Sequence, residues 1–141
     1  MIARRLALIA FAVSACGLAS CSKGDGRKPT FPVSGTVTDG TKGIPNALVI
    51  LHPVGEDGPD VVRPRGTTGA DGTFTLTTYD GNDGAPAGQY RVAVTQVLAG
   101  ARPEDGPKNR LPEKYGSPKT SNLTAEVTAG RTVLKPIEVR R

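Results

Sequence analysis

The sequence predicts an all-β domain, and three observations lead to this fold class. The chain of 141 residues has 18 glycines and 12 prolines but only three phenylalanines, three tyrosines and no tryptophan, a composition that favours many turns between short strands. From residue 31 onward, short runs of alternating apolar and polar residues follow one another at the spacing typical of a β-sandwich. No helical period is long enough to predict a helix. This length supports one hydrophobic core, so one domain is expected.

The expected strands follow from the alternation within each run. In "TFTLTTY", Phe74 and Leu76 share one face, and in "YRVAVTQ" Tyr90, Val92 and Val94 do the same. Strands with one apolar and one polar face are typical of antiparallel sheets. Six antiparallel strands are expected, over residues 32–38, 47–52, 73–79, 88–97, 123–128 and 131–140.

Turn residues separate these runs. Asp-Gly pairs at residues 39–40 and 71–72 and an Ala-Gly pair at 129–130 each lie between two runs, and the pair at 71–72 is the strongest hairpin signal. A seventh, weaker strand is expected near residues 61–67, where Pro64 would confine it to a sheet edge. The side chains expected in the core are Val33, Val37, Val49, Leu51, Phe74, Leu76, Tyr90, Val92, Val94, Val127 and Val133.

The N-terminus is expected to be a secretory signal that ends at a lipid-modified cysteine. "MIARR" is a short cationic segment, and the apolar stretch over residues 6–18 is too short to span a bilayer. Residues 18–21, Leu-Ala-Ser-Cys, resemble the lipobox of bacterial lipoproteins, in which the cysteine is acylated and becomes the new N-terminus. We therefore expect a signal peptide over residues 1–20 and a lipid on Cys21. The alternatives are a plain secretory signal or weak anchor, and cleavage at Cys16, which would leave a shorter apolar segment.

Lipid anchoring at Cys21 implies a protein of the cell envelope. Residues 21–31 are rich in small, charged and proline residues, so the lipidated cysteine and a flexible tether are expected there, with the folded domain over residues 32–141. By resemblance to the lipoprotein sorting rules of diderm bacteria, in which an aspartate at this position favours the inner membrane, Ser22 implies the outer membrane, at its periplasmic or surface face. The 18 basic and 13 acidic residues are scattered without interleaved aromatic residues, so a nucleic-acid partner is not expected.

Two longer motifs resemble a known family. "VSGTVTDGTKGIPNALVILHP" and "TTGADGTFTLTTYDGNDGAPAGQYRVAV" are similar to the carboxypeptidase regulatory-like, transthyretin-like β-sandwich, and in particular to bacterial lipoproteins that carry this module. The resemblance implies a Greek-key sandwich of about seven strands, with a regulatory, structural or adhesive role. The hydroxyisourate hydrolases of the transthyretin-like group use several histidines and a C-terminal Tyr-Arg-Gly-Ser, whereas this chain has one histidine, His52, and ends in "IEVRR".

Candidate binding residues lie in two loops. Asp80, Asn82 and Asp83 are oxygen donors at a spacing that calcium can use, or they form turns stabilised by their own side chains. The long connection over residues 98–122 is either a strap, with Leu111 and Tyr115 filling the edge of the core, or a recognition surface for a protein or an envelope polysaccharide. The residues of that surface would be Arg110, Lys114, Tyr115 and Lys119.

The residues predict no catalytic centre and no cofactor. His52 is the single histidine, no serine lies in a nucleophile elbow, and the remaining residues cannot by themselves supply a zinc site. The expected function is therefore that of a lipid-anchored, non-catalytic structural or protein-interaction module. The alternative is a module that binds carbohydrate or calcium.

Overall fold

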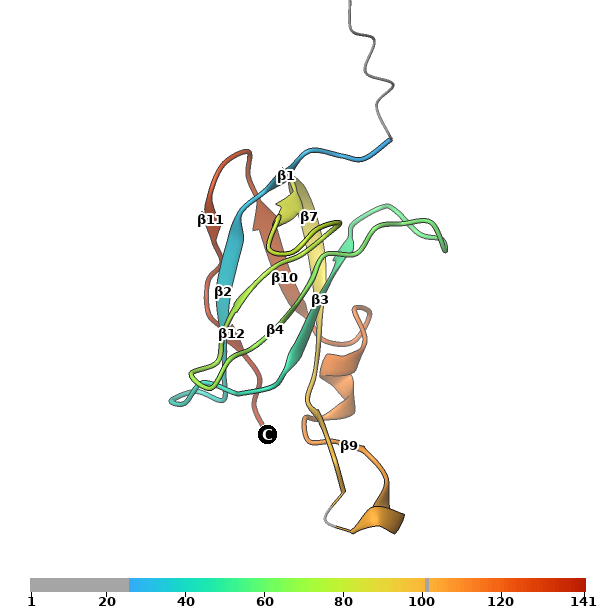
Figure 1. Ribbon diagram of the computed structural model, residues 1–141, viewed down its shortest axis with the longest axis vertical. Coiled ribbons are helices and arrows are strands. Elements are labelled where there is room, and N and C mark those ends of the chain that lie inside the picture. Colours follow the sequence, from blue (N-terminus) through green and yellow to red (C-terminus); the bar gives the residue numbers. More distant parts are fainter. Residues whose placement is uncertain (1–25, 101) are drawn as a thin grey trace, which may run out of the picture.

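The computed structural model describes residues 26–100 and 102–141, and its regular structure is almost entirely β (Figure 1). The all-β prediction is thereby confirmed, whereas Cys16, Cys21 and the expected signal peptide lie outside the described residues. Among the described residues, no helix has the length and apolar character needed to cross a membrane. The elements are β1 (Thr30–Phe31), β2 (Val33–Thr38), β3 (Leu48–Pro53), β4 (Arg65–Thr67), β5 (Thr73–Thr75), β6 (Ala85–Pro86), β7 (Gly88–Thr95), β8 (Val97–Leu98), η1 (Pro103–Asp105), β9 (Lys108–Asn109), η2 (Glu113–Gly116), β10 (Leu123–Val127), β11 (Thr132–Val133) and β12 (Ile137–Glu138).

One four-stranded sheet is antiparallel and has the order β10-β7-β3-β4. Leu51 of β3 lies opposite Val92 of β7, and the next residues, His52 and Arg91, also form a pair. Because paired residues share a face, the apolar pair points to the core and the polar pair points outward. The expected weak strand over 61–67 is shorter than predicted, since β4 begins only after Pro64, and it lies at the edge of this sheet.

The second four-stranded sheet is built around β2. β5 pairs with β2 antiparallel, while β11 and β12 pair with it parallel. The prediction of one continuous strand over residues 131–140 in an antiparallel sheet is therefore wrong. Pro136 lies between β11 and β12, and proline has no N–H to donate to the ladder.

The two sheets share one core, which contains nearly all the side chains expected there. Val133 is the exception, with 74% of its surface exposed, whereas its neighbour Leu134 is 8% exposed. Val133 is in register with Ser34, whose side chain lies on the outward face of β2 between Val33 and Gly35. Alternation within so short a strand did not indicate which face is buried.

The N-terminal segment is part of the folded unit. Thr30 and Phe31, which were expected in the tether, form β1 and pair antiparallel with Pro86 and Ala85 of β6. In Figure 1 this segment enters at one end of the long axis, and η1 lies at the opposite end. The ordered domain therefore begins before the expected boundary at residue 32.

Candidate functional site

The loop that was a candidate calcium site is organised by its own hydrogen bonds. The carboxylate of Asp83 accepts the backbone N–H groups of Thr78 at 2.6 Å, Tyr79 at 3.0 Å and Asp80 at 3.2 Å. Asn82 has a positive φ of 60° and its side-chain oxygen accepts the hydroxyl of Thr75. Within residues 26–100 and 102–141, no three His, Cys, Asp or Glu side chains gather in a way that could hold a metal ion. Of the two alternatives left open by the sequence, this geometry supports the turn.

Asp83 titrates below its ordinary range. Burial favours the neutral carboxyl, but the backbone N–H bonds from Thr78, Tyr79 and Asp80 stabilise the charged form and lower the pKa of Asp83. The carboxylate therefore stabilises the folded loop above the unfolded-state pKa of about 3.9, and this contribution is lost as pH falls through the lower folded-state pKa.

We expect Asp83→Asn to lower the free energy of unfolding by about 1 kcal/mol at neutral pH, because an amide accepts these bonds more weakly and the site is partly exposed. Urea titrations at several pH values measure the free energy of unfolding. The difference in this free energy between Asp83→Asn and the parent protein should become smaller below pH 4. Asp80→Asn is the matched control, since the side chain of Asp80 is mostly exposed and its ion pair contributes little. Equal losses in both variants would contradict the assigned role of Asp83.

The long connection over residues 98–122 packs against the domain. Leu111 and Tyr115 are buried, and the Tyr115 hydroxyl accepts the backbone N–H of Arg140 at 3.0 Å. The side-chain oxygen of Asn109 accepts the N–H groups of Gln96 and Leu111. These contacts support the strap interpretation and remove the Tyr115 ring from the candidate recognition surface.

The three cations of that candidate surface remain exposed but do not line one common hollow. Lys119 lines a depression of about 260 Å³ together with Arg91 and Thr124. Arg110 and Lys114 do not line it, and the Lys114 ammonium lies 4.8 Å from the centre of the Tyr115 ring. This depression is therefore lined by only one of the four sequence-predicted residues, Lys119.

His52 lies on the outward face of β3, beside Arg91 of β7. Burial, and then the nearby positive charge of Arg63, lower the pKa of His52 below its usual value of 6.5. Among the described residues, no hydrogen bond joins this ring to a serine, a threonine or a carboxylate. A nucleophile–base pair of the kind that covalent catalysis requires is therefore not formed around His52 in this part of the chain.

A groove at the end where the described chain begins was not expected from the sequence. Its volume is about 430 Å³, and its walls are the linker residues Gly26 and Lys28, the loop over residues 53–62, Tyr79, and residues 86–90. We call it the linker groove. Such a volume lies within the range of small-ligand sites. The groove is formed by segments far apart in the sequence, and the only local signal is an aromatic residue, Tyr79, at the end of an expected strand.

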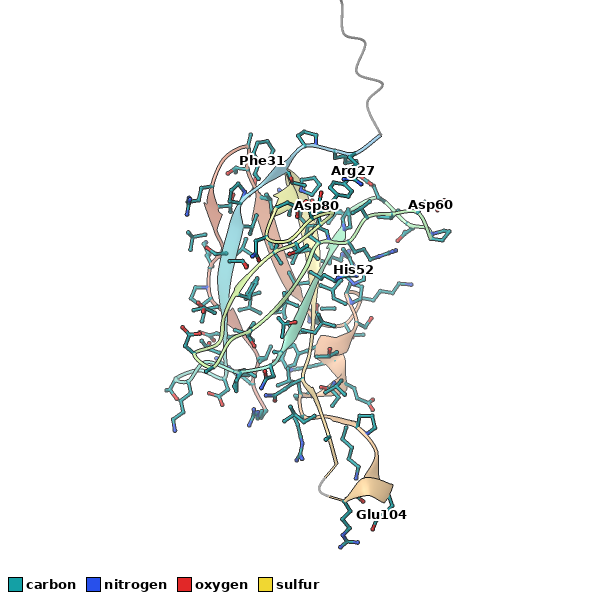
Figure 2. The ribbon with its side chains drawn as sticks, viewed as in Figure 1. Arg27, Phe31, His52, Asp60, Asp80 and Glu104 are labelled. Carbon is teal, nitrogen blue, oxygen red and sulfur yellow. The ribbon has the colours of Figure 1, made fainter. Side chains whose placement is uncertain are left out.

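The linker segment, residues 26–31, is held against this groove by several contacts. The Lys28 backbone N–H donates to the Tyr79 hydroxyl at 3.1 Å, and its ammonium pairs with Glu56. Arg27 pairs with Asp80 at 3.3 Å, and its guanidinium lies 5.1 Å from the centre of the Tyr79 ring. Figure 2 shows Arg27 and Asp80 near each other at this end, with Asp60 at the outer part of the neighbouring loop.

Comparison of the chain with models of protein families, with curated proteins and with solved structures finds no match. The function is therefore inferred from the residues and from their arrangement in the fold.

Proposed function

We propose that this chain is a lipid-anchored, extracytoplasmic module of a bacterial cell envelope that acts by structure or interaction and not by catalysis. The observation that carries the proposal is the lipobox-like stretch over residues 18–21, which ends five residues before the described domain begins. Five residues span at most about 18 Å when fully extended. A lipid on Cys21 would therefore keep the end of the domain that carries β1 close to the membrane.

The arrangement of the domain agrees with this role. The linker segment is docked at one end of the long axis, so the opposite end, which carries η1, would point away from the membrane (Figure 1). Ser22 after the cysteine supports placement in the outer membrane. The presence of a single histidine, His52, in the sequence supports a non-catalytic role.

We also propose that the fold is a Greek-key sandwich of the carboxypeptidase regulatory-like type. Two four-stranded sheets that share one core, with β2 and β7 as central strands, support this assignment. The motifs "VSGTVTDG" and "GQYRVAV" fall on β2 and β7. Fold alone does not specify a ligand, so the function is argued from the anchor and from the surface.

A second candidate function is carbohydrate binding, and the linker groove is the observation that favours it. The calcium alternative has less support, because the oxygens of Asp83 and Asn82 already accept hydrogen bonds from the loop itself.

We expect Cys21→Ser to abolish acylation and to move the protein from the membrane fraction to the soluble fraction. Incorporation of a labelled fatty acid, followed by fractionation, measures both effects. Cys16→Ser is the matched control and should leave acylation unchanged. If acylation persists in the Cys21 variant and disappears in the Cys16 variant, the cleavage site lies at Cys16 and not at Cys21.

A further inference from the structure

We propose that the linker groove binds a neutral saccharide segment of a polysaccharide. This proposal deepens the second candidate function and is independent of the lipid anchor. The first argument is the chemistry of the walls. Apolar surface from Tyr79, Pro59 and Val54 lies beside the polar side chains of Lys28, Glu56 and Gln89. Sugar rings have apolar C–H faces and a rim of hydroxyls, so they need both kinds of surface close together.

The polar groups suit hydroxyl groups better than ions. The Lys28 ammonium and the Glu56 carboxylate form an ion pair, which places hydrogen-bond donors and acceptors next to each other without a local excess of charge. The hydroxyl of Tyr90 donates to the Pro86 carbonyl at 2.6 Å, and burial, with the nearby charge of Glu56 and then Tyr79, raises the pKa of Tyr90 to about 12. This hydroxyl therefore stays neutral at physiological pH.

The charges around the groove select against anionic sugars. The lining contains one cation, Lys28, which pairs with Glu56, and two further carboxylates, Asp57 and Asp60. Uronic acids and phosphorylated sugars would be repelled by these carboxylates. The ligand class is therefore a neutral hexose or N-acetylhexosamine segment.

Tyr79 is the residue on which a sugar ring would stack. The Arg27 guanidinium lies over this ring at 5.1 Å from its centre but does not line the groove, whereas Tyr79 does. The side chain is only partly buried. An aromatic side chain supplies contact area at a low cost in conformational entropy, and tyrosine is enriched among residues that dominate binding energies.

The test uses the full-length protein as purified from the expressing cells, in a detergent without a sugar headgroup, titrated with tetra-N-acetylchitotetraose, maltotetraose and tetragalacturonate while backbone amide NMR shifts are recorded. We expect at least one neutral tetramer to shift the amides of Val54, Tyr79 and Gln89 saturably, and tetragalacturonate to bind more weakly. Tyr79→Ala should weaken binding about tenfold. Tyr79→Phe keeps the ring but loses the hydroxyl that accepts the Lys28 N–H, so its affinity should lie between those of the parent and of Tyr79→Ala, and Thr124→Ala, in the other depression, should change nothing.

Three results would overturn the proposal. The first is the absence of a shift with either neutral tetramer at about 10 mM, because an affinity too low to be detected at this concentration is weaker than a recognition site of this size requires. The second is shifts confined to the depression around Arg91 and Lys119. The third is tighter binding of tetragalacturonate than of the neutral tetramers. The NMR map does not depend on any variant, so misfolding of Tyr79→Ala would not obscure the outcome. Acylation at Cys21 is measured separately, so failure of the sugar proposal and failure of the anchoring proposal are distinguishable.

Discussion

Leu51→Ala should lower the free energy of unfolding by about 2–5 kcal/mol, as expected for a large side chain removed from a packed core. Leu51 is 0% exposed and lies in β3, opposite Val92 of β7. Its removal would leave a cavity between the two sheets that the short strands around it cannot close without losing their register. Urea unfolding followed by circular dichroism measures the loss.

Leu48→Ala is the matched control for this prediction. Leu48 lies in the same strand, on the opposite face, and 36% of its surface is exposed. The same chemical change there should cost less than about 1 kcal/mol, because little apolar area returns to water. Equal destabilisation by the two variants would mean that the faces of β3 are assigned wrongly.

Gly84→Ala should cost about 3 kcal/mol and release the linker segment from the domain. Gly84 has a φ of +88°, where a side chain is strained, and an added Cβ would lie 1.8 Å from the carbonyl oxygen of Phe31. Because the obstacle is backbone, the variant can relieve the overlap only by moving β1 away from β6. Gly81→Ala is the control in the same loop, since no atom outside its immediate neighbours lies within 4 Å of the added Cβ.

Release of the linker segment can be measured directly by limited trypsin digestion. The bond after Lys28 precedes Pro29 and resists trypsin, so the informative cut is the bond between Arg27 and Lys28. We expect this cut to be slow in the parent protein and in Gly81→Ala, and fast in Gly84→Ala. Equally slow cutting in all three proteins would show that β1 stays docked in spite of the added methyl group.

The all-β fold was predictable because alternation within a strand depends on neighbours that are close in the sequence. Phe74 and Leu76, like Val92 and Val94, lie two residues apart and are buried together. Val133 was assigned to the wrong face because the orientation of β11 is set by its pairing with β2, which lies roughly 100 residues earlier. The break between β11 and β12 near Pro136 follows from the backbone N–H that proline lacks. The pattern of apolar residues carries no information about this hydrogen-bond donor.

The candidate site was harder to predict than the fold. Leu111 and Tyr115 were recognised as possible strap residues because apolar side chains in a long polar loop need a surface to cover. The linker groove depends instead on contacts such as Lys28 with Glu56 and with Tyr79, between residues that no local pattern connects. The role of Asp83 was predictable as a turn, whereas its three N–H donors required the folded loop.

The position of β2 at the centre of its sheet bears on how the protein is made. β2 is synthesised early, but its parallel neighbours β11 and β12 are synthesised roughly 100 residues later. Contacts between such distant residues form slowly, because the entropy of closing the loop is lost before the contacts contribute stability. The sheet can therefore be completed only after residue 138 has left the ribosome. Folding of this sheet is therefore completed only when synthesis of the described residues is almost finished.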